Sequence, residues 1–395
     1  MISEKMWELG TKSSVIREIF EYGKKRKAEI GAENVFDFSL GNPSIPAPAK
    51  VKETYLKLIS EADPIMLHGY TSAAGDLGVR SKIAEHISNK FGCVAVATDI
   101  YMTCGAAAAL MVTLRAIVNA GDEVVVLAPF FPEYTVFIES AGAEQRIVKC
   151  REPDFQIDAD VFEAAVNKNT KAVIINSPNN PTGAVLSEEN IKKLSEILLE
   201  KQKEYGHEIY IIADEPYREL AYDVDVPYIP NYYDNTIVCY SYSKSLSLPG
   251  DRIGYVFVSS KVAESKNVFA AVCGAGRSLG YVCAPALAQL VIGECVDEVA
   301  DISAYKENRD LLYNTLVSYG YEAVKPEGAF YLFVKSPCSN AAVFCEKAKE
   351  YEILFVPSDS FGYEGYVRIS YCVSKKTIEK SLPAFKALME EYIGA

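Results

Sequence analysis

The segment 171–183, KAVIINSPNNPTG, joins a short apolar run to a loop that contains two prolines and a glycine. Short runs rich in Val and Ile, without alternating polar residues, are typical of strands buried in a parallel sheet. Helical spacing follows at 187–205. Further apolar runs of the same kind lie at 123–127, 208–213, 236–241 and 253–258. This alternation predicts an α/β fold with a mostly parallel sheet covered by helices.

The C-terminal part has a different order of elements. Helical stretches are expected at about 300–317, 340–350 and 375–392, and short strands at 329–334, 353–356 and 366–371. They predict a second, smaller α+β domain. We therefore divide the chain into an N-terminal segment (1–47) that packs with the small domain, a large domain (48–300) and a small C-terminal domain (301–395). A helix is expected at about 13–30 in the first segment.

The composition is that of an ordinary globular protein, since 49% of the 395 residues are hydrophobic and 24% are charged. The formal net charge is −13, from 40 basic and 53 acidic residues. A field of this sign argues against nucleic-acid partners and anionic membrane surfaces, and no apolar stretch is long enough to predict a membrane span. The 10 cysteines include no C-x-x-C pair, which favours reduced thiols in a cytoplasmic protein. No metal site is expected from the three histidines.

In an open parallel sheet, ligands bind beyond the carboxyl ends of the strands, so the residues after each run are candidates. Asp214 and Tyr217 follow the run at 208–213, and Asn180 lies in the rigid loop after the run at 171–176. An acid at this place faces the ligand crevice. On these residues alone, Asp214 could equally cap a helix and the loop could be an ordinary tight turn.

Ser241 and Lys244 follow the run at 236–241, and Arg252 stands eight residues after the lysine. A lysine buried at the mouth of a sheet has a lowered pKa and becomes a nucleophile toward carbonyl groups. The planar fork of an arginine can bind a phosphate. The alternative for Lys244 is a solvated loop residue.

Two weaker signals concern anions. Gly105, Ala106 and Ala107 open an alanine-rich helix after a strand-like segment, and the free N–H groups of a helix start can bind phosphate. Arg368 lies between Val367 and Ile369 in an apolar strand, so it points away from both and could hold a carboxylate. Many helices start in the same way, however, and a surface arginine would also fit the strand.

Taken in this order, the segments resemble the fold-type I pyridoxal-phosphate enzymes, and more narrowly the class I and II aminotransferases of the aspartate aminotransferase kind. The resemblance extends from Leu40-Gly41-Asn42-Pro43 to Arg368, and its most specific parts are Asn180-Pro181-Thr182-Gly183 and Ser241-x-x-Lys244 with Arg252. It implies pyridoxal 5'-phosphate as cofactor. It also implies transfer of an amino group from an L-amino acid, with aspartate as the first guess, to a 2-oxo acid.

The resemblance implies catalytic roles for three residues and binding roles for the others. Lys244 would form a Schiff base with the cofactor and act as general base, Asp214 would pair with the ring nitrogen, and Tyr217 would hydrogen-bond the phenolic oxygen. Cofactor binding would also involve Gly105, Ala106, Ala107, Phe131, Asn180, Ser241 and Arg252, and substrate binding would involve Gly41, Asn180 and Arg368.

The resemblance also implies a homodimer, because Tyr70 matches a tyrosine that reaches the phosphate from the neighbouring subunit. Arg277 lies near the spacing at which dicarboxylate-specific members hold the substrate side chain, which makes it a further candidate.

Other functions match fewer residues. Ser241-x-x-Lys244 also occurs in penicillin-binding serine acyl enzymes, but no Lys-Thr-Gly is present. The glycines at 274–280 resemble a dinucleotide fingerprint, with the last glycine one residue too far. A pyridoxal-phosphate C–S β-lyase acting on sulfur amino acids is the main alternative. A cofactor-binding regulator would usually carry an added basic segment for DNA.

Overall fold

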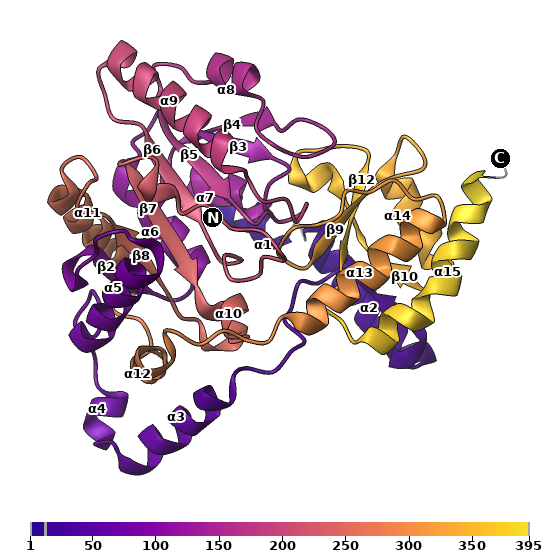
Figure 1. Cartoon of the computed structure of the whole chain (residues 1–395), viewed down its shortest axis with the longest axis horizontal. Coiled ribbons are helices and arrows are strands. Elements are labelled where there is room, and N and C mark those ends of the chain that lie inside the picture. Colours follow the sequence, from indigo (N-terminus) through magenta and orange to yellow (C-terminus); the bar gives the residue numbers. More distant parts are fainter. Residues whose placement is uncertain (1, 12–13, 394–395) are drawn as a thin grey trace.

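The structure, a computed structural model, describes residues 2–11 and 14–393 (Figure 1). Its centre is a seven-stranded sheet in the order β2-β8-β7-β6-β5-β3-β4. Neighbouring strands from β7 through to β4 pair in parallel. The strands are β2 (Ile100–Thr103), β3 (Glu123–Ala128), β4 (Glu144–Lys149), β5 (Thr170–Asn176), β6 (Tyr210–Asp214), β7 (Thr236–Ser241) and β8 (Gly254–Val258). This confirms the predicted α/β fold with a mostly parallel sheet.

Helices cover both faces of this sheet, and every residue of β3, β6 and β7 is therefore buried. Sequence signals define their ends: the Ser187 side chain caps the start of α9, and Gly206 ends the same helix in the left-handed conformation. The helices of this region are α3 (Ala49–Glu61), α4 (Pro64–His68), α5 (Leu77–Phe91), α6 (Ala106–Ile117), α7 (Glu133–Ala141), α8 (Ala159–Ala165), α9 (Glu188–Tyr205), α10 (Tyr242–Ser245), α11 (Ser265–Ser278) and α12 (Ala286–Cys295).

The expectation for 253–258 was wrong in one respect, since β8 runs antiparallel to both β7 and β2. After β7 the chain turns through α10 and η4 (Pro249–Asp251) and runs back directly beside β7. A parallel pair would need a long crossover, usually a helix packed across the sheet. A buried apolar run looks the same in either direction, so periodicity does not predict strand polarity.

The C-terminal part contains the predicted smaller α+β unit. Three antiparallel strands in the order β11-β12-β9 pack against helices. These strands and helices lie together and are coloured orange and yellow in Figure 1. The elements are α13 (Ser303–Ser318), β9 (Tyr331–Lys335), α14 (Ala341–Lys349), β11 (Val356–Pro357), β12 (Tyr366–Ser370) and α15 (Lys375–Ile393).

The single strand expected at 353–356 is in fact two strands in different sheets. β10 (Ile353–Leu354) pairs in parallel with β1 (Phe36–Asp37), whereas β11 pairs with β12. The chain changes partner at Phe355, which is 1% exposed. The apolar run is continuous because all of it is buried, and the change of partner leaves no trace in its pattern.

The N-terminal segment contains α1 (Glu4–Thr11) and α2 (Val15–Ile30). The helix expected from residue 13 corresponds to α2, and residue 13 itself lies outside the described residues. Ile19 and Val35 pack against Leu354 and Val356 of the C-terminal unit. Short 3-10 turns complete the chain: η1 (Ala32–Asn34), η2 (Ala97–Asp99), η3 (Ile229–Asn231) and η5 (Ser358–Phe361). Within the described ranges, no helix has both the length and the apolar character needed to cross a membrane.

Candidate active site

The carboxyl ends of β5, β6 and β7 meet at one edge of the sheet, where Asn176, Asp214 and Ser241 end their strands. A cavity of about 290 Å³ opens there. Eleven of the residues predicted from the sequence line it, namely Gly41, Ala106, Ala107, Phe131, Asn180, Asp214, Tyr217, Ser241, Lys244, Arg252 and Arg368. The other lining residues are Ile16, Leu40, Leu110, Asn176, Pro216, Ser243, Pro249 and Tyr331.

Lys244 enters the cavity from the one-turn helix α10. Its ammonium donates to the carbonyl oxygen of Gly41 over 2.9 Å and lies 5.3 Å from the centre of the Phe330 ring. Burial lowers the pKa of Lys244 to about 8, and the nearby Arg252 and Arg368 act in the same direction. About a tenth of this amine is therefore uncharged at pH 7, far more than for an ordinary lysine, and the uncharged form is the one that a nucleophile or base requires.

Asp214 lies at the end of β6 and is 4% exposed. The Tyr134 hydroxyl donates to its Oδ2, while Oδ1 is buried and has no hydrogen-bond partner in the described part of the chain. Burial raises the pKa of Asp214 to about 7, and the Tyr134 hydrogen bond opposes this rise. A buried carboxylate oxygen without a partner is costly, which indicates a place for a ligand donor.

Two amides and two phenols also line the cavity, namely Asn176, Asn180, Tyr217 and Tyr331. Asn176 donates to the carbonyl oxygen of Asp214 over 2.9 Å and accepts from the backbone N–H of Asn180 over 2.8 Å. The hydroxyls of Tyr217 and Tyr331 lie 2.9 Å apart, and burial raises the pKa of Tyr217 well above its usual value. Burial raises the pKa of Tyr331 as well, to about 12. Both phenols are thus neutral, and because one of the two donates to the other, one O–H remains to donate into the cavity.

Arg368 points from β12 into the cavity and is 3% exposed. Its guanidinium donates to Asn180 Oδ1 over 3.1 Å and to the carbonyl oxygen of Ser39 over 2.6 Å. Nε has no partner, and no carboxylate of the described residues forms an ion pair with this arginine. A buried cation without a counter-ion is unfavourable, so this arrangement is suited to binding an anion.

Arg252 lies beside the N-terminus of α6. It donates to the carbonyl oxygens of Pro249 over 2.9 Å and Cys104 over 3.1 Å. Gly105 precedes α6 with a φ of +87°, and a Cβ there would lie 2.6 Å from the guanidinium. The arginine can therefore stand beside the free N–H groups of a helix start only because residue 105 is glycine, and together they form an anion site.

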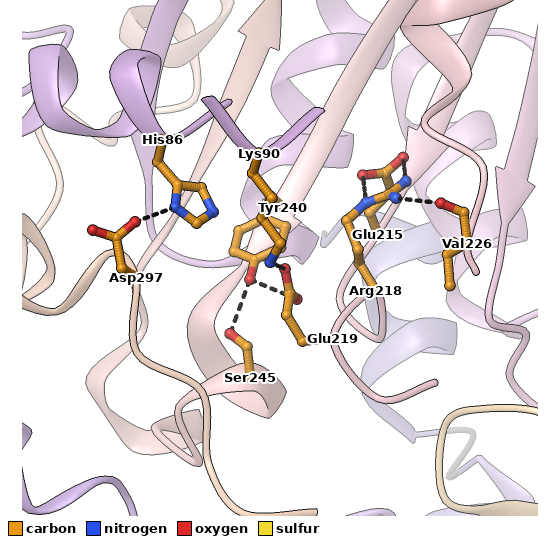
Figure 2. A network of polar contacts seen from close by, with 9 residues as sticks. All are labelled: His86, Lys90, Glu215, Arg218, Glu219, Val226, Tyr240, Ser245 and Asp297. Atoms are coloured by element: carbon orange, nitrogen blue, oxygen red, sulfur yellow. Dashed lines mark hydrogen bonds and ion pairs between the residues drawn. The ribbon is translucent and has the colours of Figure 1, made fainter. Parts of the chain in front are cut away.

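A buried ion pair holds the loop after β6 (Figure 2). Arg218 forms two hydrogen bonds with the carboxylate of Glu215 and donates to the carbonyl oxygen of Val226 over 3.2 Å. The guanidinium also lies 4.9 Å from the centre of the Tyr228 ring. This loop begins directly after Asp214 and carries Tyr217, so the pair gives both side chains a rigid support.

Some predicted residues lie outside the cavity lining. Gly105 only adjoins it, through Arg252. Tyr70 is 89% exposed in the loop after α4, and Arg277 is exposed at the end of α11. Within the described ranges, no cluster of three or more His, Cys, Asp or Glu side chains could hold a metal ion.

Two residues of the site, Tyr134 and Tyr331, were not predicted from the sequence. Tyr134 ends the segment Pro129–Tyr134, three residues after Phe131, so the first turn of α7 brings the two rings together beside Asp214. That spacing could have suggested Tyr134. Tyr331 stands at the start of a strand far along the chain, and nothing in its local pattern distinguishes it from a core tyrosine.

Comparison with known proteins gives consistent results. Residues 33–385 match the family model for aminotransferases of class I and II. A probable N-acetyl-LL-diaminopimelate aminotransferase of Bacillus subtilis is 33% identical over 381 residues, which cover 93% of this chain and 92% of that protein.

Two solved structures show the same fold over nearly the whole chain. An amino transferase from Eubacterium rectale has a TM-score of 0.97 at 55% identity and covers 99% of both chains. The aspartate aminotransferase of Thermus thermophilus, solved with maleate, has a TM-score of 0.87 at 25% identity and covers 98% of this chain and 100% of its own.

Proposed function

The chain belongs to the family of class I and II aminotransferases, which depend on pyridoxal phosphate, and on this basis we propose which residues of the cavity carry the transamination. The reaction moves an amino group from an amino acid to a 2-oxo acid. One observation supports the assignment: a single cavity is lined by Lys244, Asp214 and Arg368. The pKa of the Lys244 amine is lowered, and two buried atoms, Asp214 Oδ1 and Arg368 Nε, have no hydrogen-bond partner in the described part of the chain.

The residues present fit pyridoxal phosphate. Asp214 Oδ1 would accept from the protonated ring nitrogen, and Phe131 offers an aromatic face to the ring. Arg252, the start of α6 and Ser241 would hold the phosphate. Tyr217 and Asn180 would hydrogen-bond the phenolic oxygen. The partnerless oxygen of Asp214 gains a donor in this way, which removes the cost of its burial.

Bound pyridoxal phosphate supplies an aldehyde that bonds to amines and a protonated ring that accepts electron density from the substrate Cα. Lys244 Nζ, as a free amine, would take the proton from the substrate Cα and deliver it to the carbon of the former aldehyde group, so that the proton is moved between these two carbons. Asp214 keeps the ring nitrogen protonated because it carries the opposite charge. The burial that lowers the pKa of Lys244 would also limit the access of bulk water to the proton transfer.

Arg368 and Gly41 orient the substrate. The partnerless Nε and the planar guanidinium would receive the α-carboxylate, beside the Asn180 amide that already contacts this arginine. Lys244 enters the same cavity from α10 and contacts the carbonyl oxygen of Gly41, so a carboxylate held by Arg368 would leave the substrate Cα in the space that Lys244 reaches.

We propose that the active form is a homodimer in which Tyr70 reaches the phosphate of the neighbouring subunit. Tyr70 is 89% exposed in its own chain. The nearby helices α3 and α4 project from the body of the molecule (Figure 1) and carry the exposed apolar side chains Leu56, Ile59, Ile65 and Met66. A second copy that covered this surface would bury them.

We also propose the domain division 1–47, 48–300 and 301–395, which is supported by the packing of Ile19 and Val35 against the C-terminal unit. A cytoplasmic location is proposed on different grounds. The ten cysteines are all free thiols, and a reducing compartment preserves such thiols.

Replacing Lys244 tests the assignment directly. We expect Lys244→Ala to bind cofactor through Arg252 and Asp214 but to lose at least about 10³-fold in transamination, because no amine replaces the base. Borohydride treatment of the wild-type holoenzyme should attach a pyridoxyl mass to Lys244, read by peptide mass spectrometry. A modified lysine elsewhere, or wild-type turnover in Lys244→Ala, contradicts the proposal.

The donor is identified by following the absorbance of the bound cofactor with each amino acid, starting with aspartate. Products then separate this chemistry from that of a C–S β-lyase. A new amino acid formed from an added 2-oxo acid is the expected result. Pyruvate and ammonia from cysteine-type substrates would indicate the lyase instead.

A further inference from the structure

A hydrogen-bond network connects Tyr240, Glu219 and Lys90 to Ser245, the residue after Lys244 (Figure 2). The Tyr240 hydroxyl donates to Glu219 Oε2 over 2.8 Å and is also hydrogen-bonded to the Ser245 hydroxyl at 2.9 Å. Lys90 reaches the other oxygen of Glu219 from α5, at 3.4 Å. Tyr240 is 6% and Ser245 is 2% exposed, so water does not compete for the hydrogen bond between these two hydroxyls.

The network joins the two segments that carry the proposed catalytic side chains. Glu219 belongs to the loop beyond β6, which begins directly after Asp214 and carries Tyr217. Ser245 follows Lys244 directly in α10. The Tyr240 hydroxyl lies between the two segments and bonds to both, so it fixes their separation.

The turn that carries Lys244 depends on such contacts. α10 is a single turn of four residues, and a helix this short has no stability of its own. The backbone N–H of Ala300 donates to the carbonyl oxygen of Ser245 over 2.7 Å, and the Ser241 side chain caps the start of the turn. The bond from Tyr240 to Ser245 adds the connection to the loop beyond β6.

The ring of Tyr240 is held separately from its hydroxyl. It stacks on Tyr255 with centroids 5.0 Å apart, and Tyr242 meets it edge-on, also at 5.0 Å. Removing the hydroxyl alone therefore leaves the aromatic packing in place. This separates an effect of the hydrogen bonds from an effect of packing.

We propose that Tyr240 and Glu219 are positioning residues for Lys244. Together they hold the α10 turn at a fixed distance from the loop beyond β6, so that Nζ can exchange a proton with the substrate. The inference rests on the proposed role of Lys244. The Tyr240 hydroxyl bonds to Ser245 and to the Glu219 carboxylate rather than to Nζ, so the effect passes through Ser245 and the backbone of α10.

The test compares holoenzyme variants in the first half-reaction, followed by absorbance at increasing concentrations of amino acid. Tyr240→Phe should lower the rate constant at saturation about tenfold, the size of effect expected from one buried hydrogen bond. The half-saturating concentration should change less than about twofold, because Arg368 is untouched. Tyr233→Phe is the matched control: it removes another buried hydroxyl, which donates to the carbonyl oxygen of Ile209 over 2.6 Å, remote from the cavity lining.

Glu219 provides a conservative rescue. Glu219→Ala should lower the saturated rate constant as Tyr240→Phe does, and Glu219→Gln should recover most of that loss, because the amide oxygen still accepts from Tyr240. Melting temperatures are measured on the same samples, so that loss of stability is read separately from loss of rate.

The proposal would be overturned if Tyr240→Phe kept the wild-type rate constants while its melting temperature fell as much as that of Tyr233→Phe. If Tyr240→Phe cannot be isolated, Ser245→Ala breaks the same connection, and normal rate constants there would overturn it equally. A wild-type protein that shows no cofactor-linked half-reaction contradicts the proposed function, an outcome distinct from any effect of Tyr240.

Discussion

Among single residues, Lys244 and Asp214 have pKa values that burial shifts toward neutrality. The pKa of Lys244 falls to about 8 and that of Asp214 rises to about 7, in both cases because burial disfavours the charged form. Lys244 must be uncharged to act as a base, so its shift helps. Asp214 must be charged to hold a protonated ring nitrogen, so its shift has to be restrained.

The Tyr134 hydroxyl supplies that restraint, since its hydrogen bond favours the ionised form of Asp214. Tyr134→Phe should raise the pKa of Asp214 further. The carboxylate exists only above this pKa, so the acidic limb of the kcat/KM profile should move to higher pH by about 0.5 to 1 unit, the size of one hydrogen bond. The measurement is kcat/KM as a function of pH.

Tyr321→Phe is the control for this prediction. Tyr321 is 3% exposed, and its hydroxyl donates to the carbonyl oxygen of Phe385 over 2.8 Å in the C-terminal unit. It should lose stability without moving the acidic limb. An unchanged limb in Tyr134→Phe would mean that Asp214 keeps its charge without help from this hydroxyl.

Among the elements, the start of α6 and the turn before β8 meet at Gly105. Gly105→Ala should weaken cofactor binding about ten- to a hundredfold, because the new Cβ would displace the Arg252 guanidinium from the helix start. Equilibrium titration of the protein with pyridoxal phosphate measures this loss.

Gly121→Ala is the control that separates the contact between a Cβ at residue 105 and Arg252 from the effect of backbone strain. Gly121 has a φ of +92°, close to the +87° of Gly105, but nothing lies within 4 Å of the place that a Cβ would take there. Both substitutions should lower stability by about 1 kcal/mol through the positive φ. Equal cofactor affinity in the two variants would show that Arg252 does not depend on the space at Gly105.

For the molecule as a whole, a site shared between subunits would let two inactive variants complement each other. Tyr70→Ala and Lys244→Ala subunits are mixed, dissociated and reassociated. Random reassociation makes about half of the dimers mixed. If Tyr70 acts across the interface, each mixed dimer has one intact site, with Lys244 from one subunit and Tyr70 from the other. Activity should then return to about a quarter of wild type. No recovery, together with weak activity in Tyr70→Ala alone, would mean that Tyr70 serves its own subunit.

Much of the architecture could be predicted from local sequence. The apolar runs at β3, β5, β6 and β7 and the helix expected at 187–205 agree with the structure, because burial and capping act within a few residues. The candidate site followed from one further rule. Parallel strands share a direction, so Asn180, Asp214 and Lys244 had to come to the same edge of the sheet.

Local pattern was thus enough to indicate which side chains stand at the ends of the strands, because the signals for a strand and for its end lie within a few residues of each other. Long-range packing determined that β8 turns back, that the chain changes sheets at Phe355 and that Tyr134 restrains Asp214. The same is true of the contact between Lys244 and Gly41. These features depend on residues far apart in the chain, whose meeting is set by packing and by buried hydrogen bonds that leave no periodic signal in the sequence.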